Sequence, residues 1–103
     1  MNNQQEKVAE FMEKHELGGT SAFRLLDLVS EVGEVAKDAT KSAEYGESPE
    51  ELDVKKDEIG DVLFSLLAVS NDLGIDVEEA FQEAMNKYEK RLDEGGDPGS
   101  GSH

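Results

Sequence analysis

Two short segments of the chain carry the same pattern of carboxylates, and these residues are the ones best suited to chemistry. Residues 31–35 read Glu-Val-Gly-Glu-Val, and residues 58–62 read Glu-Ile-Gly-Asp-Val. Acids at positions i and i+3 project from one face of a helix, about one turn apart. Two such helices packed side by side would place four carboxylates around one point, where like charges raise each other's pKa and repel. A hard divalent cation relieves that repulsion, so the sequence predicts a site for Mg2+, or alternatively Mn2+, formed by Glu31, Glu34, Glu58 and Asp61.

The alternative interpretation is that these acids lie on solvated helix faces, which is the ordinary place for a carboxylate in a chain with 25 of them. Both pairs, however, lie in the most apolar predicted helices, where a buried carboxylate is costly unless it is paired or metal-bound. Each pair also encloses a glycine, although a glycine inside a helix costs roughly 1 kcal/mol relative to alanine. The glycines therefore indicate either close approach between helices or room for a ligand. A di-iron site is not indicated, because its Glu-x-x-His motifs are absent.

A small basic group near the end of the chain is the counterpart of these acids. Lys87 and Arg91 are four residues apart, and Arg91 is one of only two arginines. Because Mg2+ commonly binds through substrate phosphates and arginine binds phosphate in a bidentate manner, the pair is predicted to contact phosphate. Asn86 is a candidate for a hydrogen bond to a base or sugar. The alternative is an ordinary surface pairing on a helix, for example Glu83 with Lys87.

The spacing of apolar residues predicts four helices that position these groups. They are expected over about residues 4–16, 21–45, 48–73 and 76–93. Thr20 or Ser21 should cap the second helix and Gly46 should end it. Ser48, followed by proline and then glutamate at the third position, matches the start of the third helix, and Asp76 should cap the fourth.

The third helix is apolar on most of its sides between Ile59 and Val69. Such a helix must be enclosed on most sides, and three other short helices would not enclose it alone. The sequence therefore predicts an all-α, four-helix bundle completed by oligomerisation, with a second copy of the chain covering the rest. The bundle is expected to occupy residues 1–94, followed by a disordered Gly/Ser/Pro-rich tail over residues 95–103.

The composition excludes several other classes of protein. The chain has 10 basic and 25 acidic residues and a formal net charge of −15. Nucleic acids and anionic membranes are bound by basic patches, so neither is an expected partner, whereas a small phosphorylated substrate is compatible because bound cations invert the local field. The absence of cysteine excludes disulfides and a thiol nucleophile. No apolar run reaches membrane-spanning length and no signal peptide is evident at the start, so a cytoplasmic location is expected.

Taken together, these residues resemble the signature of the MazG-like nucleoside triphosphate pyrophosphohydrolases, a family of the all-α NTP pyrophosphatase superfamily. That signature is Glu-Glu-x-x-Glu followed, after a variable spacer, by Glu-x-x-Asp. Residues 30–34 and 58–61 match it, except that Ser30 stands in place of the first glutamate, which leaves Asp57 as the remaining candidate for an outer-shell acid. The Lys-x-x-x-Arg element of Lys87 and Arg91 also resembles the family, and the resemblance covers about residues 5–93.

The resemblance implies a MazG-like bundle that forms a tight homodimer or a dimer-of-dimers tetramer. It also implies Mg2+-dependent cleavage of an NTP or dNTP between the α and β phosphates, which yields a nucleoside monophosphate and pyrophosphate and serves nucleotide-pool house-cleaning. In this hypothesis Glu34 or Glu31 accepts the proton of the attacking water, while Lys87 and Arg91 hold the phosphates.

Other interpretations stay open at the level of sequence. The base pocket is expected to be apolar, and its candidate residues are Phe11, Phe64 and Tyr88, each of which could equally belong to the core. A related enzyme, phosphoribosyl-ATP pyrophosphatase, would use the same metal chemistry. A non-catalytic helical interaction module is the alternative from a different class, and in it the acids would form a solvated or ion-binding surface.

Overall fold

A computed structural model describes residues 3–95 of the chain, and helices are its only regular secondary structure there. Its four α-helices are α1 (Asn3–Lys14), α2 (Ser21–Ser42), α3 (Lys56–Asp72) and α4 (Val77–Asp93). Two short 3-10 turns, η1 (Glu44–Gly46) and η2 (Pro49–Glu51), lie between α2 and α3. The predicted all-α class with four helices is confirmed. The predicted tail falls on residues that, apart from Gly95, lie outside the described range.

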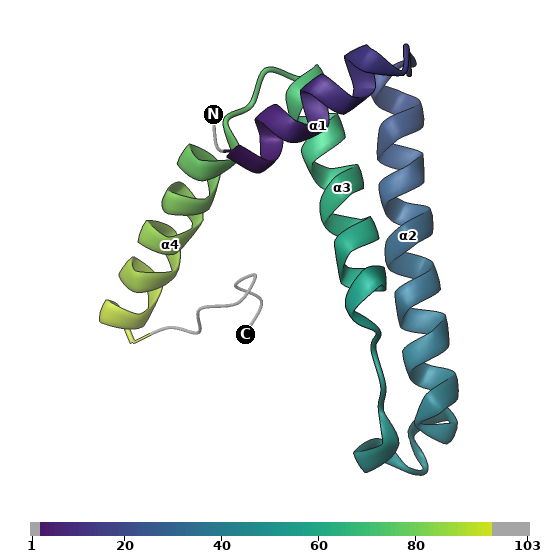
Figure 1. The fold of residues 1–103 in the computed structure, drawn as a ribbon. Coiled ribbons are helices and arrows are strands. Elements are labelled where there is room, and N and C mark those ends of the chain that lie inside the picture. Colours follow the sequence, from purple (N-terminus) through teal and green to yellow (C-terminus); the bar gives the residue numbers. More distant parts are fainter. Residues whose placement is uncertain (1–2, 96–103) are drawn as a thin grey trace.

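Helices α2 and α3 pack side by side as an antiparallel pair, and α1 crosses the upper end of α3 (Figure 1). An ion pair between Arg24, near the start of α2, and Asp72, at the end of α3, marks one end of this pair. The small core lies where α1 meets α3, with Val8 packed against Leu67 and Ala68. The antiparallel pair is therefore the frame on which both carboxylate segments are held.

Two of the predicted helix caps are confirmed by hydrogen bonds. The hydroxyl oxygen of Thr20 accepts a hydrogen bond from the backbone N–H of Phe23 at 3.2 Å, at the start of α2. A carboxylate oxygen of Asp76 accepts from the backbone N–H of Glu78 at 2.9 Å and from that of Glu79 at 3.4 Å, at the start of α4. Both side chains satisfy N–H groups that the first turn of a helix leaves unpaired.

The predicted start of the third helix is wrong, since α3 begins at Lys56 rather than at Ser48. The Ser48 hydroxyl does not cap a helix; it donates a hydrogen bond to a carboxylate oxygen of Glu44 at 3.0 Å. After the short turn η2 the chain runs non-helically over residues 52–55 to α3, and there the backbone N–H of Asp53 donates to the hydroxyl oxygen of Ser42 at 2.8 Å. This contact fixes the segment against the end of α2 and competes with the helix that the local sequence favours.

The end of the second helix also differs from the prediction. Helix α2 ends at Ser42 instead of extending to Tyr45. Glu44 and Tyr45 have φ angles of 51° and 56°, which lie in the left-handed region and break the α-helix there. Gly46 follows with a φ of 96°, so it contributes to the turn and not to a cap directly after the helix.

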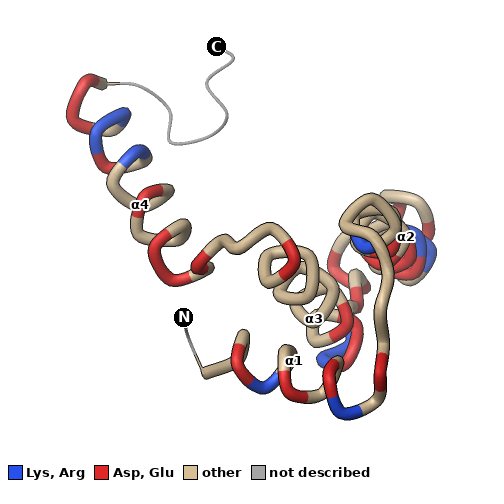
Figure 2. Tube along the Cα trace, turned by 90° about the horizontal axis from the view of Figure 1, so that it is seen from above, with Lys and Arg blue, Asp and Glu red and all other residues tan. Residues whose placement is uncertain are grey.

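Helix α4 stands apart from the α2–α3 pair within the single chain (Figures 1 and 2). Its start is held by Gln5, whose side chain is fully buried. The amide oxygen of Gln5 accepts from the backbone N–H of Val77 at 2.8 Å, and its amide nitrogen donates to the carbonyl of Ile75 at 2.9 Å and to the side-chain oxygen of Asn71 at 3.1 Å. One residue of α1 thus fixes the connection between α3 and α4.

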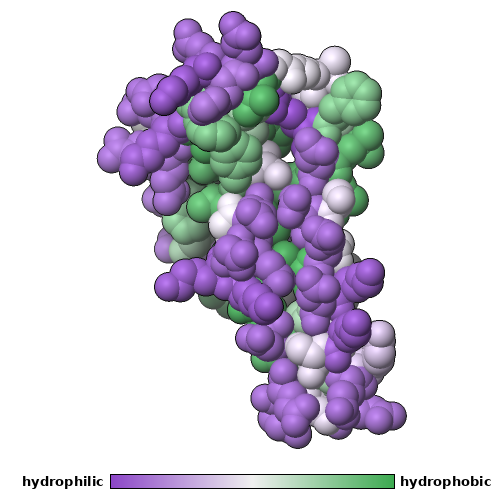
Figure 3. Space-filling view, turned by 45° about the vertical axis from the view of Figure 1, so that its right-hand side comes forward, coloured by the Kyte–Doolittle hydropathy of each residue, from purple (hydrophilic) through white to green (hydrophobic). Residues whose placement is uncertain are grey.

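Many large apolar side chains are exposed in the single chain. Val29 is 67% exposed, Leu26 is 62% exposed and Ile59 is 56% exposed. Figure 3 shows hydrophobic groups exposed over the upper part of the molecule, while the lower end is largely hydrophilic. Completion of the bundle by a second copy remains a prediction. Over residues 3–95, none of the helices is both long enough and apolar enough to cross a membrane.

Candidate functional site

Helical spacing relates the predicted metal ligands of α2 to two acids of that helix that line cavities shared with α3. Asp27 lines a small cavity together with Phe64, Ser65 and Ala68 of α3. Asp38 lines a second cavity, of about 260 Å³, together with Glu58. Residues 27 and 38 are three helical turns apart and therefore share one face of α2. Glu31 and Glu34 lie between them on that same face, at spacings of three or four residues.

The predicted ligands of α3 lie on a matching face. Glu58 lines the cavity shared with Asp38, and Ser65 and Ala68 line the cavity shared with Asp27. Asp61 falls between Glu58 and Ser65 at helical spacing, so it belongs to the same stripe. Helical spacing thus puts the four predicted ligands on two stripes, one on α2 and one on α3, which we call the acidic stripes.

The structure does not gather these carboxylates around one point. Among residues 3–95, no group of three or more aspartate, glutamate or histidine side chains is arranged to hold a metal ion. Glu31 and Glu58 are partly buried, whereas Glu34 and Asp61 are exposed. The convergence expected from the sequence is therefore not seen in the single chain, and the roles of the four residues as ligands remain predictions.

Glu58 is the most unusual of the four carboxylates. Its Oε2 atom is buried and, within the described structure, has no hydrogen-bond partner. Burial raises the pKa of the Glu58 carboxyl above its ordinary value, and the negative charges of Asp38 and Asp57 raise this pKa further. A buried carboxylate oxygen without a partner is costly, and a bound cation is one of the few groups that can satisfy it. The chemistry of this residue therefore fits an Mg2+ ligand.

The glycines enclosed by the two carboxylate pairs do not mark a close approach between helices. A Cβ atom added at Gly33 or at Gly60 would meet no other atom within 4 Å. The close-approach explanation is therefore wrong within one chain. Open space at both positions agrees with the other explanation, that the glycines leave room for a neighbouring molecule.

The predicted phosphate-binding residues lie on α4 and do not meet the acidic stripes within one chain. The Lys87 amine lies over the Tyr88 ring, 5.2 Å from its centroid, and the Asn86 side-chain oxygen accepts from the Gln82 amide at 3.0 Å. Arg91 is partly buried one turn beyond Lys87. Figure 2 shows the basic residues of α4 far from α2. Their contact with phosphate remains a prediction.

Of the three aromatic candidates for a base pocket, two lie together. The rings of Phe11 and Phe64 pack edge to face, with centroids 5.8 Å apart. Phe64 also lines the small cavity beside Asp27. Tyr88 lies on α4, away from this pair.

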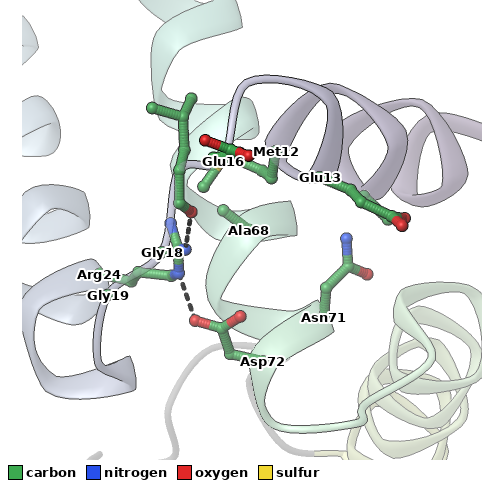
Figure 4. Close-up of a pocket in the computed structure, with 11 residues that line it drawn as sticks. Met12, Glu13, Glu16, Gly18, Gly19, Arg24, Ala68, Asn71 and Asp72 are labelled. Atoms are coloured by element: carbon green, nitrogen blue, oxygen red, sulfur yellow. Dashed lines mark hydrogen bonds and ion pairs between the residues drawn. The ribbon is translucent and has the colours of Figure 1, made fainter.

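A larger cavity of about 520 Å³, which we call the turn cavity, lies where α1, α2 and α3 meet. Its walls include Met12, Leu17, Arg24, Ala68 and Asp72. The Arg24 guanidinium donates through Nε to a carboxylate oxygen of Asp72 and through Nη2 to the carbonyl of Leu17 at 2.8 Å (Figure 4). The sequence reasoning missed Arg24, although its being one of only two arginines in an acidic chain was a usable signal.

The arrangement is that of a helical protein with a carboxylate stripe on each of two packed helices, and comparison with known proteins identifies its class. Residues 20–95 match the family described as the MazG nucleotide pyrophosphohydrolase domain. Because this match covers most of the chain, the chain belongs to that family.

Two comparisons point to the same relative, the YpjD protein of Bacillus subtilis. The curated sequence, named as an uncharacterized protein, is 40% identical over 68 residues, which are 62% of this chain and 60% of the relative. The aligned part of the chain thus spans about 60% of the length of that relative. A crystal structure of YpjD, described there as a candidate pyrophosphatase, superposes with a TM-score of 0.72 and 33% identity, covering 88% of this chain and 94% of the other.

Proposed function

We propose that this chain is an Mg2+-dependent nucleoside triphosphate pyrophosphohydrolase. It converts an NTP or dNTP to the monophosphate and pyrophosphate. The observation that carries this proposal is the buried, unpartnered Oε2 atom of Glu58 beside the acidic stripes, in a chain of the MazG family. A carboxylate in that state favours a cation, and a nucleotide's phosphate chain is the natural second partner of Mg2+.

The residues that would hold the metal are Glu31, Glu34, Glu58 and Asp61. When bound, Mg2+ would offset the negative charge of the phosphates and lower the pKa of a coordinated water. Mn2+ has the same preference for oxygen ligands and is the expected substitute.

Glu34 is the better candidate for the general base, with Glu31 as the alternative. Glu34 is exposed on the α2 stripe and can accept a proton from water, whereas Glu31 is partly buried. As this proton leaves, the water oxygen bonds to the α-phosphorus, and the bond from that phosphorus to the oxygen that bridges the α and β phosphates breaks. Pyrophosphate then departs with the bonding electron pair.

The basic residues of α4 would bind the phosphates. Lys87 supplies a point charge, Arg91 can bind two phosphate oxygens at once, and Asn86 can hydrogen-bond to the sugar or base. Because α4 stands apart from the acidic stripes in one chain, we propose that α4 of another copy supplies these contacts in a homodimer or a dimer of dimers. The exposed apolar residues of α2 and α3 support such an assembly, since patches of this kind commonly mark interfaces.

The test is release of pyrophosphate from a panel of canonical NTPs and dNTPs, modified nucleotides and phosphoribosyl-ATP, with Mg2+ and with EDTA. The expected result is Mg2+-dependent release that falls at least about a hundredfold in Glu34→Gln, on the scale of a lost general base. Glu10→Gln is the charge-matched control, because Glu10 is exposed on α1 and lines none of the cavities described above. Parental activity in a folded Glu34→Gln protein would refute its assignment as the base, and no release from any substrate would refute the function.

A thermal shift separates the hydrolase from a non-catalytic helical module. Mg2+ with a non-hydrolysable NTP should raise the melting temperature of the hydrolase by binding only the folded state. A module whose acids are simply solvated should show no such increase beyond that caused by equal ionic strength.

A further inference from the structure

We propose that the turn cavity binds the nucleotide base and favours bases that carry an exocyclic amino group, such as cytosine and adenine. This inference rests on the proposed hydrolase function, which it makes more specific. It also differs from the apolar base pocket expected from the sequence, because the polar groups of the turn cavity are mainly hydrogen-bond acceptors.

The turn cavity has the size and construction of a small-molecule site. Its volume of about 520 Å³ lies within the range of ligand pockets, roughly 300–1,000 Å³. Three helices and the Gly18-Gly19 turn border this open cavity, with Met12, Leu17 and Ala68 as apolar walls. Apolar walls against which a flat ring can pack, together with a few fixed polar groups, are typical of such sites.

The side chains of the cavity that can donate hydrogen bonds are partly engaged within the protein. Two of the three Arg24 nitrogens are engaged, one by Asp72 and one by the carbonyl of Leu17. The Asn71 amide nitrogen donates to the backbone carbonyl of Gln5 at 3.0 Å, and the Asn71 oxygen accepts from the Gln5 amide. The wall therefore keeps some donors for a ligand, chiefly at Nη1 of Arg24, to which no hydrogen bond is assigned among the described residues.

The three carboxylates of the cavity nevertheless make its polar wall richer in acceptors than in donors. Asp72 has one carboxylate oxygen joined to Arg24, and in Figure 4 its carboxylate extends from α3 below Ala68. Glu13 and Glu16 contribute two further carboxylates from the other side. Arg24 is only 14% exposed, so it holds the Asp72 carboxylate in one orientation. A fixed acceptor favours a ligand that presents N–H groups, and it repels one that presents a carbonyl oxygen in their place.

The turn cavity also lies close enough to the acidic stripes for one nucleotide to reach both. Arg24 and Ala68 line both the turn cavity and the small cavity beside Asp27. Along α2, Arg24 precedes Glu31 by two turns, about 10 Å at the rise of an α-helix. A nucleotide with its base in the turn cavity can thus extend its sugar and phosphates toward the carboxylates.

The experiment uses pairs of substrates that differ only in an amino or an oxo group at one ring position. These pairs are dCTP with dUTP and dATP with dITP, and kcat/KM for pyrophosphate release is measured for each with Mg2+. The parent protein is expected to favour the amino member of each pair by about tenfold or more, as for hydrogen bonds to a charged acceptor. Asp72→Asn should reduce this ratio toward one, and Glu16→Gln should reduce it in part without disturbing the Arg24 contact. Glu10→Gln removes the same charge outside the cavity and should leave the ratio unchanged.

These measurements test the assignment of the base to the turn cavity independently of the hydrolase function. Equal rates within both pairs, or the same ratio in Asp72→Asn, Glu16→Gln and Glu10→Gln, would overturn the base assignment and leave the hydrolase intact. If no triphosphate is hydrolysed, binding of deoxycytidine and deoxyuridine is compared by NMR titration. In that case the signals of Arg24 and Asn71 should shift with deoxycytidine at lower concentration than with deoxyuridine, and equal titration of both would overturn the proposal.

Discussion

Replacing Gln5 by leucine should destabilise the protein by about 3 kcal/mol. Three polar groups lose a partner in this variant: the N–H of Val77, the carbonyl of Ile75 and the side-chain oxygen of Asn71. An unsatisfied buried group costs about 1–3 kcal/mol, and the lower end of this range applies because the surroundings are only partly buried. Leucine is similar in size to glutamine, so no large cavity cost is added. The loss is considerable against a typical total stability of about 5–15 kcal/mol.

The measurement is urea unfolding followed by circular dichroism, at one protein concentration so that association does not change the comparison. Gln4→Leu is the matched control, because Gln4 is the neighbouring residue of α1 and is exposed. Its effect should stay within about 0.5 kcal/mol, as for most surface substitutions. If both variants unfold at the same urea concentration, the Gln5 contacts do not hold the α3–α4 connection and this reasoning is wrong.

Three further predictions concern the acidic stripes, the loop before α3 and the exposed apolar surface. Without Mg2+, the Glu58→Gln variant should melt at a higher temperature than the parent. This difference in melting temperature should grow as the pH rises through the raised pKa of Glu58, because the protonated carboxyl that folding favours is then lost. Saturating Mg2+ should reverse the order of the two melting temperatures, and a difference that stays constant across the pH series would contradict the assignment. Ser42→Ala should cost about 1 kcal/mol and speed amide exchange at Asp53, whose N–H loses its acceptor; unchanged exchange there would show that the contact does not hold the loop. Val29→Glu should shift sedimentation toward the monomer relative to the parent, whereas Glu10→Gln, an exposed substitution on α1, should not; sedimentation of Val29→Glu equal to that of the parent would place Val29 outside the interface.

The fold class and most helix positions could be predicted because they depend on local patterns. The caps formed by Thr20 and Asp76 use side chains that bond to N–H groups two or three residues away, so sequence alone determines them. The start of α3 could not be predicted in this way. Ser48 satisfies the local rule for a helix start, but the hydroxyl of Ser42 binds the N–H of Asp53 across eleven residues, and no periodicity reveals that contact.

For the candidate site, too, the sequence predicts what depends on neighbouring residues and does not predict contacts between distant ones. Helical spacing alone puts Glu31 with Glu34, and Glu58 with Asp61, on single faces, and the antiparallel packing of α2 and α3 then makes those faces neighbours. Spacing does not determine how closely the two faces approach, and in one chain the carboxylates stay apart. The buried Oε2 atom of Glu58 is therefore the informative result, because in the described part of a single chain it has no hydrogen-bond partner, and a donor or a cation would stabilise it. The Gln5 contacts fix the start of α4, and this helix with its basic residues stands apart from the acidic stripes. We therefore expect a bound cation and a second copy of the chain to complete the site.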